Sequence, residues 1–263
     1  MTTRLIALFL TCLPVWGMSQ WVELYKIPVR SDFIAMDNLL NIYSVSQSEL
    51  FKYDKNGVFQ FRFSDKQLGD IGEIDITFPL RPLVVYPEIN YITILDNTLS
   101  DNRGKRNLLD HDIALATAAC TSIQNHYWIY DAMAFSLVRV DEGFKKILET
   151  GNLSQILGIE LVPNFMLEFA NRLYLNNPLT GILVFDIFGT YMKTIPIPGL
   201  IRFQVTDGGV IYFKENSIYK YDPVLFQTTE FILPSEAIFA VMQKNRVALV
   251  NSEEIVVIEL AAP

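Results

Sequence analysis

Residues that could do acid–base, nucleophilic or metal chemistry are few in this chain. Its 263 residues include two histidines and two cysteines. His111 stands in Asp110-His111-Asp112, and carboxylates together with imidazole are a ligand set that suits divalent cations. Because neighbouring residues of an extended strand point to opposite faces, these three side chains cannot easily converge on one ion. We therefore expect a solvated loop at this position and no metal site.

The sequence contains no local motif of a catalytic site. H-E-x-x-H, C-x-x-C, G-x-S-x-G and Walker patterns do not occur. Glu253-Glu254 pairs two carboxylates, but glycoside hydrolysis requires a defined separation between such groups, so a charged hairpin turn is the simpler interpretation. We expect no catalytic residue, no cofactor and no bound metal, and hence no enzymatic activity.

The most unusual charged segment is the basic run from Ser100 to Asn107. It contains Arg103, Lys105 and Arg106, in a chain with 21 Lys and Arg against 29 Asp and Glu and a formal net charge of −8. A basic loop on an acidic protein can dock an acidic partner, so these three residues are the candidate partner-binding site; a solvated hairpin is the plainer alternative. Nucleic acid is excluded as a partner because the phosphate backbone requires a basic footprint.

The first residues, 1–19, have the three-part pattern of a secretory signal peptide. A short start containing Arg4 precedes the apolar run Leu5–Trp16, and small residues lie just before a cut between Ser19 and Gln20. The run is shorter than the roughly 20 residues that a membrane-spanning helix needs. We expect export to the periplasm or the outer membrane, with no transmembrane segment after cleavage.

Cleavage would leave one cysteine. Cys12 lies in the predicted signal, and Thr11 stands where a lipoprotein signal normally has a small residue, so a lipid anchor on Cys12 is the less favoured alternative. Cys120 then has no partner for an internal disulfide, and the core must be stable without one. We expect Cys120 to be a small buried side chain.

The elements that would position any site are strands. The chain is 51% hydrophobic and 19% charged, which excludes a disordered chain, a collagen-like chain and a coiled coil. Short runs of Ile, Val, Leu, Phe and Tyr recur between Asp, Asn, Gly and Pro, the pattern of strands and turns. Phe59, Phe61 and Phe63 alternate with polar residues, as in a strand with one buried face.

The strands repeat in fours. An aromatic residue or Val followed by Asp ends the third strand of several units, at Asp54, Asp141, Asp186 and Asp222, which are 87, 45 and 36 residues apart. The first interval is about twice the others, so it contains one further unit. A period of about 40 residues with four strands predicts a β-propeller.

We count six units, of which the last, from Phe239 to Ile258, supplies only three strands. The N-terminal segment Trp21–Pro28 can supply the fourth and close the ring, which removes an exposed edge. The prediction is a six-bladed β-propeller of four-stranded antiparallel meanders, formed by one domain over 20–263; a β-sandwich or two smaller β-domains are the alternatives. Irregular segments are expected at 64–77 and 100–112, and a short helix at 152–157.

Some β-propellers are calcium-dependent lactonases or hydrolases that line a central channel with Glu, Asn and Asp. Residues that could face a channel mouth here are Asn38, Asn97, Asn171, Asn176, Asn177 and Asp207. Asn and Asp are also the default residues of turns, and the Glu-Gly-Pro start of such lactonases is missing. A calcium-dependent hydrolase with a channel-mouth site is therefore the alternative function.

Several phrases of the sequence resemble a family of exported β-propeller-like proteins of Bacteroidota. The phrases are 75–86, 94–100, 149–153, 163–167 and 181–189. The resemblance implies a cell-envelope setting and carries over no catalytic residue, because the family has no established enzymatic motif. We expect a non-catalytic scaffold or adaptor that binds other envelope or outer-membrane proteins, with a role in an assembly such as type IX secretion.

Overall fold

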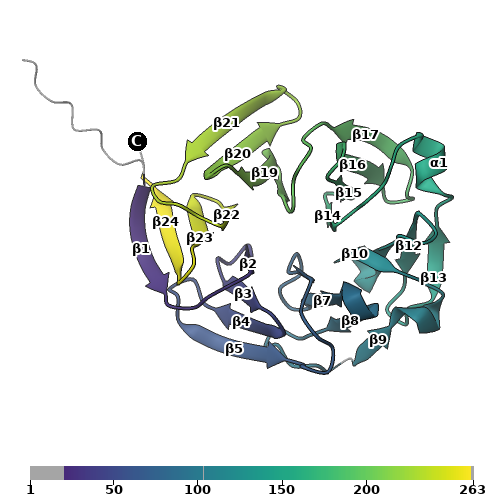
Figure 1. The fold of residues 1–263 in the computed structure, drawn as a ribbon, viewed down its shortest axis with the longest axis horizontal. Coiled ribbons are helices and arrows are strands. Elements are labelled where there is room, and N and C mark those ends of the chain that lie inside the picture. Colours follow the sequence, from purple (N-terminus) through teal and green to yellow (C-terminus); the bar gives the residue numbers. More distant parts are fainter. Residues whose placement is uncertain (1–20, 103, 262–263) are drawn as a thin grey trace, which may run out of the picture.

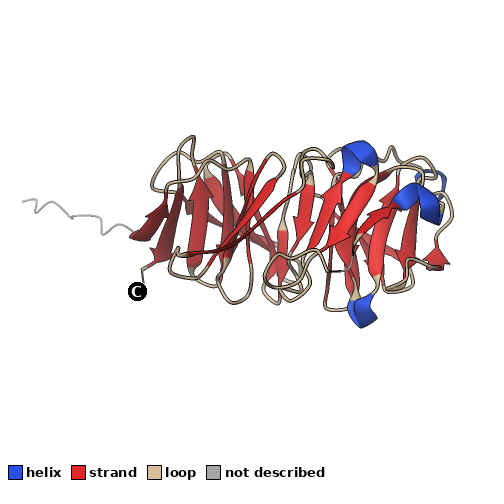
Figure 2. Cartoon of the chain, turned by 90° about the horizontal axis from the view of Figure 1, so that it is seen from below, coloured by secondary structure: helices blue, strands red, loops and turns tan. Residues whose placement is uncertain are grey.

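The computed structural model describes residues 21–102 and 104–261, and within them the chain forms a ring of six four-stranded sheets (Figure 1). The predicted signal peptide, 1–19, lies outside the described residues. Each sheet is an antiparallel meander, and the ring seen from the side is a disc with turns on its two faces (Figure 2). The predicted six-bladed β-propeller is confirmed.

The six sheets are named blades 1 to 6, and their strands are given from the centre outward. Blade 1 contains β2 (Phe33–Met36), β3 (Ile42–Ser46), β4 (Glu49–Tyr53) and β5 (Phe59–Ser64). Blade 2 contains β6 (Glu73–Asp75), β7 (Leu83–Tyr86), β8 (Tyr91–Ile94) and β9 (Lys105–Asn107). Blade 3 contains β10 (Ala116–Thr121), β11 (Tyr127–Asp131), β12 (Ser136–Val140) and β13 (Lys146–Glu149). Blade 4 contains β14 (Phe165–Phe169), β15 (Arg172–Asn177), β16 (Gly181–Asp186) and β17 (Tyr191–Ile195). Blade 5 contains β18 (Gln204–Thr206), β19 (Gly209–Lys214), β20 (Ser217–Asp222) and β21 (Gln227–Ile232). Blade 6 contains β22 (Phe239–Gln243), β23 (Arg246–Val250), β24 (Ile255–Leu260) and β1 (Trp21–Ile27).

Blade 6 closes the ring by pairing the two ends of the described chain. β1 runs antiparallel to β24, with Trp21 opposite Leu260 and Ile27 opposite Ile255. The indole Nε1 of Trp21 also donates a 2.8 Å hydrogen bond to the carbonyl of Ile232 in blade 5. The predicted fourth strand from 21–28 is confirmed, and it leaves no open edge between blades 6 and 1.

The turn between the third and fourth strands has the same chemistry in five blades. In each turn one Asp carboxylate oxygen accepts hydrogen bonds from two backbone N–H groups a few residues further on, which fixes the turn. The five residues are Asp54, Asp96, Asp141, Asp186 and Asp222. Asp96 belongs to blade 2, the unit that the sequence analysis inferred from the doubled interval.

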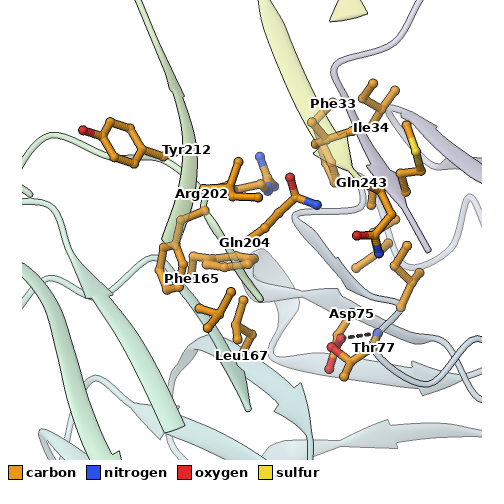
Figure 3. Close-up of a pocket in the computed structure, with 18 of the residues that line it drawn as sticks. Phe33, Ile34, Asp75, Thr77, Phe165, Leu167, Arg202, Gln204, Tyr212 and Gln243 are labelled. Atoms are coloured by element: carbon orange, nitrogen blue, oxygen red, sulfur yellow. Dashed lines mark hydrogen bonds between the residues drawn. The ribbon is translucent and has the colours of Figure 1, made fainter. Parts of the chain in front are cut away.

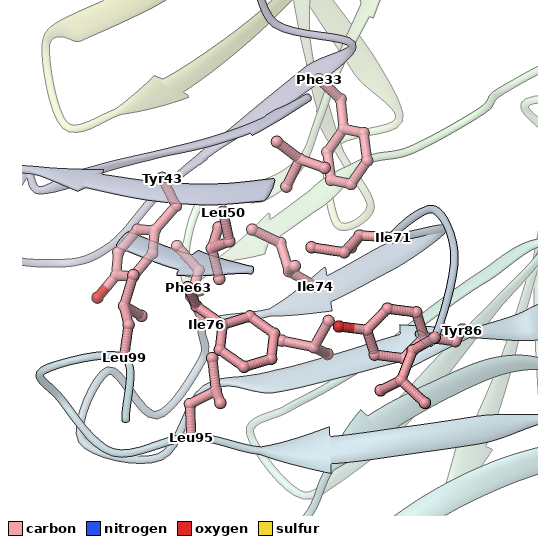
Figure 4. Packing of buried hydrophobic residues seen from close by; sticks show 13 residues of the cluster. Phe33, Tyr43, Leu50, Phe63, Ile71, Ile74, Ile76, Tyr86, Leu95 and Leu99 are labelled. Carbon is pink, nitrogen blue, oxygen red and sulfur yellow. The ribbon is translucent and has the colours of Figure 1, made fainter. Parts of the chain in front are cut away.

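The hydrophobic core is divided into six clusters, one between each pair of neighbouring blades. Figure 4 shows the cluster between blades 1 and 2, where Tyr43 and Leu50 of blade 1 face Ile74 and Tyr86 of blade 2. Each blade thus buries both of its faces against its two neighbours.

Two segments expected to be irregular contain strands. The segment 64–77 includes β6 and the segment 100–112 includes β9, the innermost and outermost strands of blade 2. Neither strand has the apolar alternation by which a strand is recognised in a sequence. Their pairing is stabilised by the neighbouring strands and by the ion pairs Arg202–Glu73 and Lys105–Asp65. The rest of 100–112 is the turn after β8 and the 3₁₀ helix η2 (Leu108–His111).

Helices are short and lie in connections between strands. The predicted helix at 152–157 is confirmed as α1 (Leu153–Leu157), whose first turn is capped by the side chain of Asn152. The other helical turns are η1 (Pro87–Ile89), η2, and η3 (Ile123–Asn125). Within the described residues no helix has the length and apolar character needed to cross a membrane.

Candidate functional site

A central cavity of about 260 Å³ lies among the innermost strands (Figure 3). Its walls come from β2, β6, β14, β18 and β22 with the segments beside them. Much of the lining is aromatic, with Phe33, Phe165, Phe203 and Phe239 among the residues that line it. A cavity of this kind is the usual place for a small ligand, so its polar groups decide which chemistry it offers.

An ion pair joins opposite blades across this cavity. Arg202, which precedes β18 of blade 5, lies with its Nε 2.9 Å from Oε2 of Glu73 in β6 of blade 2. Its Nη2 donates a 2.8 Å hydrogen bond to the carbonyl of Gly72, and the guanidinium carbon lies 3.7 Å from the ring centroid of Phe33. The arginine therefore connects blades 1, 2 and 5.

The side chain of Glu73 is buried at the cavity wall. Burial, which outweighs the opposing charge of Arg202, raises the pKa of Glu73 to about 7. The negative charge of nearby Asp75 also raises this pKa. Protonated and ionised forms of Glu73 are thus both populated near neutral pH.

Two other acids that line the cavity, Asp75 and Glu168, are used in contacts between blades. Oδ2 of Asp75 accepts hydrogen bonds of 2.7 Å and 2.5 Å from the backbone N–H and the hydroxyl of Thr121 in blade 3. Oε2 of Glu168 accepts hydrogen bonds from the Ser122 hydroxyl at 2.5 Å and the Trp128 indole at 2.9 Å. These carboxylates are saturated by donors from a neighbouring blade, so they position strands.

The residues considered for a calcium site do not gather at the cavity. Asn38 lines it, whereas the amide of Asn176 donates to the carbonyl of Leu200 and that of Asn177 to the carbonyl of Glu160. Asn97, Asn171 and Asp207 lie in turns between strands and are not among the lining residues. In the described part of the chain no three His, Cys, Asp or Glu side chains are grouped as metal ligands.

The histidines and Cys120 lie away from the cavity lining. His111 ends η2 and packs with its ring 5.4 Å from that of Phe144. Burial, with the charge of Arg139, lowers the pKa of His126. Cys120 is buried in β10, as predicted, and burial raises the pKa of its thiol.

The predicted basic segment is ordered where the structure describes it. Lys105 and Arg106 are in the outer strand β9, not in a free loop, and Lys105 forms an ion pair with Asp65 of the connection after blade 1. The guanidinium of Arg106 lies 5.7 Å from the ring centroid of Phe144 in blade 3. Arg103 lies outside the described residues.

Sequence reasoning did not single out an exposed apolar turn in blade 5. Val224, Leu225 and Phe226 follow one another between β20 and β21, and their exposed fractions are 79%, 63% and 78%. Phe188, in the equivalent turn of the neighbouring blade 4, is 69% exposed. These four side chains are called the apolar rim below. The signal that could have identified it is three large apolar residues directly after a turn-forming Asp222-Pro.

Comparison with known proteins identifies the fold of this chain and nothing beyond it. No protein-family model and no curated protein matches the chain. Among solved structures it is similar to the WD40 domain of Neurospora crassa Pan2 (8% identity, TM-score 0.62, 92% of this chain and 96% of that one covered).

Two further solved structures are similar to this chain over a comparable length. One is a catalytically inactive virginiamycin B lyase from Staphylococcus aureus with quinupristin (12% identity, TM-score 0.62, 92% and 99% covered). The other is BBS1N in complex with ARL6DN (10% identity, TM-score 0.57, 92% and 97% covered). At these identities the likeness shows that the chain has the propeller fold.

Proposed function

We propose that this chain is a non-catalytic scaffold that binds other proteins through one face of its ring. The observation that carries the proposal is the apolar rim, formed by Phe188 and Val224–Phe226. Scattered apolar side chains are normal on a protein surface, but three consecutive large ones with more than half of each exposed mark an interaction site.

The backbone of the apolar rim in blade 5 is fixed by hydrogen bonds within its turn. Oδ1 of Asp222 accepts hydrogen bonds from the backbone N–H groups of Val224 at 2.7 Å and Leu225 at 3.0 Å. Phe226 has a φ of 55°, which completes the turn in a left-handed conformation. Because the backbone is already fixed, a partner would bind with little further loss of loop entropy.

The basic residues supply a second contact in this proposal. Lys105 and Arg106 lie in the outer strand of blade 2, and the side chain of Lys105 is one-third exposed despite its ion pair with Asp65. Arg103 belongs to the same basic run of the sequence. An acidic segment of a partner could exchange with Asp65 for this lysine. We keep these three residues as the proposed electrostatic part of the interface.

We place this scaffold in the cell envelope, associated with the outer membrane or a secretion assembly. The support is the signal-like pattern of 1–19 and the resemblance of the sequence to exported Bacteroidota propellers. The likeness to BBS1N, which was solved with a protein partner, supports protein binding as a use of this fold.

The test is capture of envelope proteins by the purified mature chain. Val224→Ser with Phe226→Ser removes most of the exposed apolar surface of the turn, and we expect retention of partners to fall by about tenfold or more. Ile232→Ser is the matched control, because Ile232 is 67% exposed in the same blade but lies at the far end of β21. Equal retention by both variants and the parent would contradict the proposal.

The alternative function is a calcium-dependent hydrolase or lactonase. The observation that favours it is the cavity of about 260 Å³ with Glu73 and Arg202 inside. A lactone or ester turned over by the mature chain, with activity lost on chelation and on Glu73→Gln, would establish the alternative and overturn the non-catalytic proposal.

A further inference from the structure

A second pocket, of about 410 Å³, opens between blades 2 and 3 on the face that carries the turns after the innermost strands. It is lined by Phe78, Leu80 and Arg81 of the β6–β7 connection and by residues 122–125 of the β10–β11 connection. The pocket is separate from the central cavity, with which it shares no lining residue.

The charged group of this pocket has no counter-ion. Arg81 is 8% exposed, and its guanidinium forms no ion pair and no side-chain hydrogen bond with any described residue. Its Nη1 is buried without a partner. Burying a charged donor unpaired is unfavourable, so this arrangement calls for an acceptor that the described chain does not supply.

Aromatic rings hold the guanidinium in place. Its central carbon lies 5.8 Å from the ring centroid of Phe78 and 5.4 Å from that of Tyr127. Cation–π contacts of this kind compensate part of the desolvation but satisfy no N–H donor. The side chain is therefore oriented in advance, with donor capacity left over.

Polar groups of blade 3 lie beside this pocket. The nearest acid, Glu168, accepts hydrogen bonds from the Ser122 hydroxyl and the Ile123 backbone N–H and forms no ion pair with Arg81 among the described residues. Nδ1 of His126 is likewise buried without a partner among the described residues. Arg139 does not line the pocket, and its Nη2 donates a 2.9 Å hydrogen bond to the hydroxyl of Ser122 at the pocket wall.

We infer that this pocket binds a carboxylate attached to an apolar group. A planar guanidinium matches a carboxylate through two parallel hydrogen bonds, and one cation balances one negative charge. Phe78, Leu80 and Ile123 offer apolar surface to the body of the ligand, and each is more than one-third exposed. Two sources share this chemistry: the C-terminal carboxylate of a polypeptide ending in an apolar residue, and a free organic acid.

The site is tested with N-acetylphenylalanine and its amide, N-acetylphenylalaninamide, as the matched control. Binding to the mature chain is measured by saturation-transfer NMR and calorimetry. The acid should bind at least about tenfold more tightly than the amide, because only the acid can pair with Arg81. No binding of the acid, or equal binding of acid and amide, would overturn the inference.

Two variants separate recognition from folding. Arg81→Gln should lose the preference for the acid, and Leu80→Asp should lose it with unchanged melting temperature, because Leu80 is 77% exposed and the new carboxylate competes for Arg81. Leu179→Asp, a change of the same kind in blade 4, where Leu179 is 52% exposed, should leave binding unchanged. Retained preference in Leu80→Asp would overturn the inference.

A peptide ending in the same phenylalanine identifies the source. Tighter binding of the free-acid peptide than of N-acetylphenylalanine indicates a polypeptide C-terminus, in which case the site rests on the proposed scaffold function. Weaker binding indicates a free organic acid. Both outcomes support the carboxylate site, and neither depends on the apolar rim, so failure of the one proposal is distinguishable from failure of the other.

Discussion

At the scale of single residues, charged groups inside the ring hold neighbouring and opposite blades together. Asp75 and Glu168 accept hydrogen bonds from blade 3, and Glu73 pairs with Arg202 across the centre. A buried ion pair is weak support for stability, since desolvation offsets much of the attraction. Its more direct consequence is on protonation, which can be measured.

The stability of the ring should depend on the protonation of Glu73. Its folded-state pKa of about 7 is above the ordinary value of 4.5, so the folded chain binds this proton more tightly than the unfolded chain. The resulting stability is fully present below about pH 4.5 and is lost as the pH rises to about 7, by an amount on the order of 3 kcal/mol. Urea unfolding of the parent and Glu73→Gln between pH 5 and pH 8 measures this contribution.

Comparison of variants isolates Glu73 from other titrating groups. His126, whose pKa is lowered, titrates equally in both chains and cancels in the difference. Glu254→Gln, which changes an exposed carboxylate paired with Lys26, is the control and should keep the parent's pH dependence. Parallel curves for the parent and Glu73→Gln would show that Glu73 titrates normally.

Cys120 should be inert toward thiol reagents in the native protein. It is fully buried in β10, and burial raises the pKa of its thiol, so the reactive thiolate is scarce as well as inaccessible. Labelling of the mature chain at pH 8 should be at least about 100-fold slower than in denaturant, because reaction requires opening of the blade. Rapid labelling without unfolding would contradict this.

At the scale of elements, strands with an apolar pattern were predictable and strands without one were not. Phe59, Phe61 and Phe63 lie in β5, as expected, but only Phe63 is buried, and Phe59 is 53% exposed. β6 and β9 escaped prediction because Glu73, Asp75 and Lys105 are charged residues at strand positions. Their pairing depends on neighbours and on contacts such as Lys105–Asp65, which a local pattern cannot show.

Turn chemistry was the more reliable local signal. An Asp whose carboxylate fixes the following turn is a property of a few consecutive residues, so Asp54, Asp141 and Asp186 could be found from the sequence. Asp96 has the same hydrogen bonds but follows Leu95, not an aromatic residue or Val. The site is harder still, because Glu73 and Arg202 are 129 residues apart in the chain and meet only when the ring closes.

Strand β1 should be essential for stability. Trp21 and Ile27 are buried in the clusters between blades 5 and 6 and between blades 6 and 1. Removing 21–28 loses both side chains and the pairing with β24, which should cost at least about 3 kcal/mol of unfolding free energy. Urea denaturation of the chain beginning at residue 29 and of the chain beginning at residue 21 measures the difference.

Point variants show which part of β1 matters. Trp21→Ala should lose part of the same stability, whereas Val22→Ala should not, because Val22 is exposed in the same strand. Equal stability of the chains beginning at residues 21 and 29 would mean that the ring does not need β1 for closure.

At the scale of the whole molecule, the two proposed contacts lie on opposite sides of the ring. β9 belongs to blade 2 and the turn before β21 to blade 5, with the central cavity between them (Figure 1). The turns that join first to second and third to fourth strands share one face, since the turns of a meander alternate between faces. A partner that touches both contacts must therefore extend across this face.

This separation predicts additive and physically distinct effects on partner binding. Arg103→Ser, Lys105→Ser and Arg106→Ser together should weaken capture at low salt and matter little at high salt, because exposed charges are screened. Val224→Ser with Phe226→Ser should weaken capture at both salt concentrations, since apolar contact is not screened. The combined variant should show the sum of the two free-energy changes within about 0.5 kcal/mol, as expected for sites without shared contacts. The measurement is retention of the partner by each variant at both salt concentrations. Unchanged capture by the basic triple variant would show that β9 is not part of the interface. Strong non-additivity would show that the two contacts do not act independently.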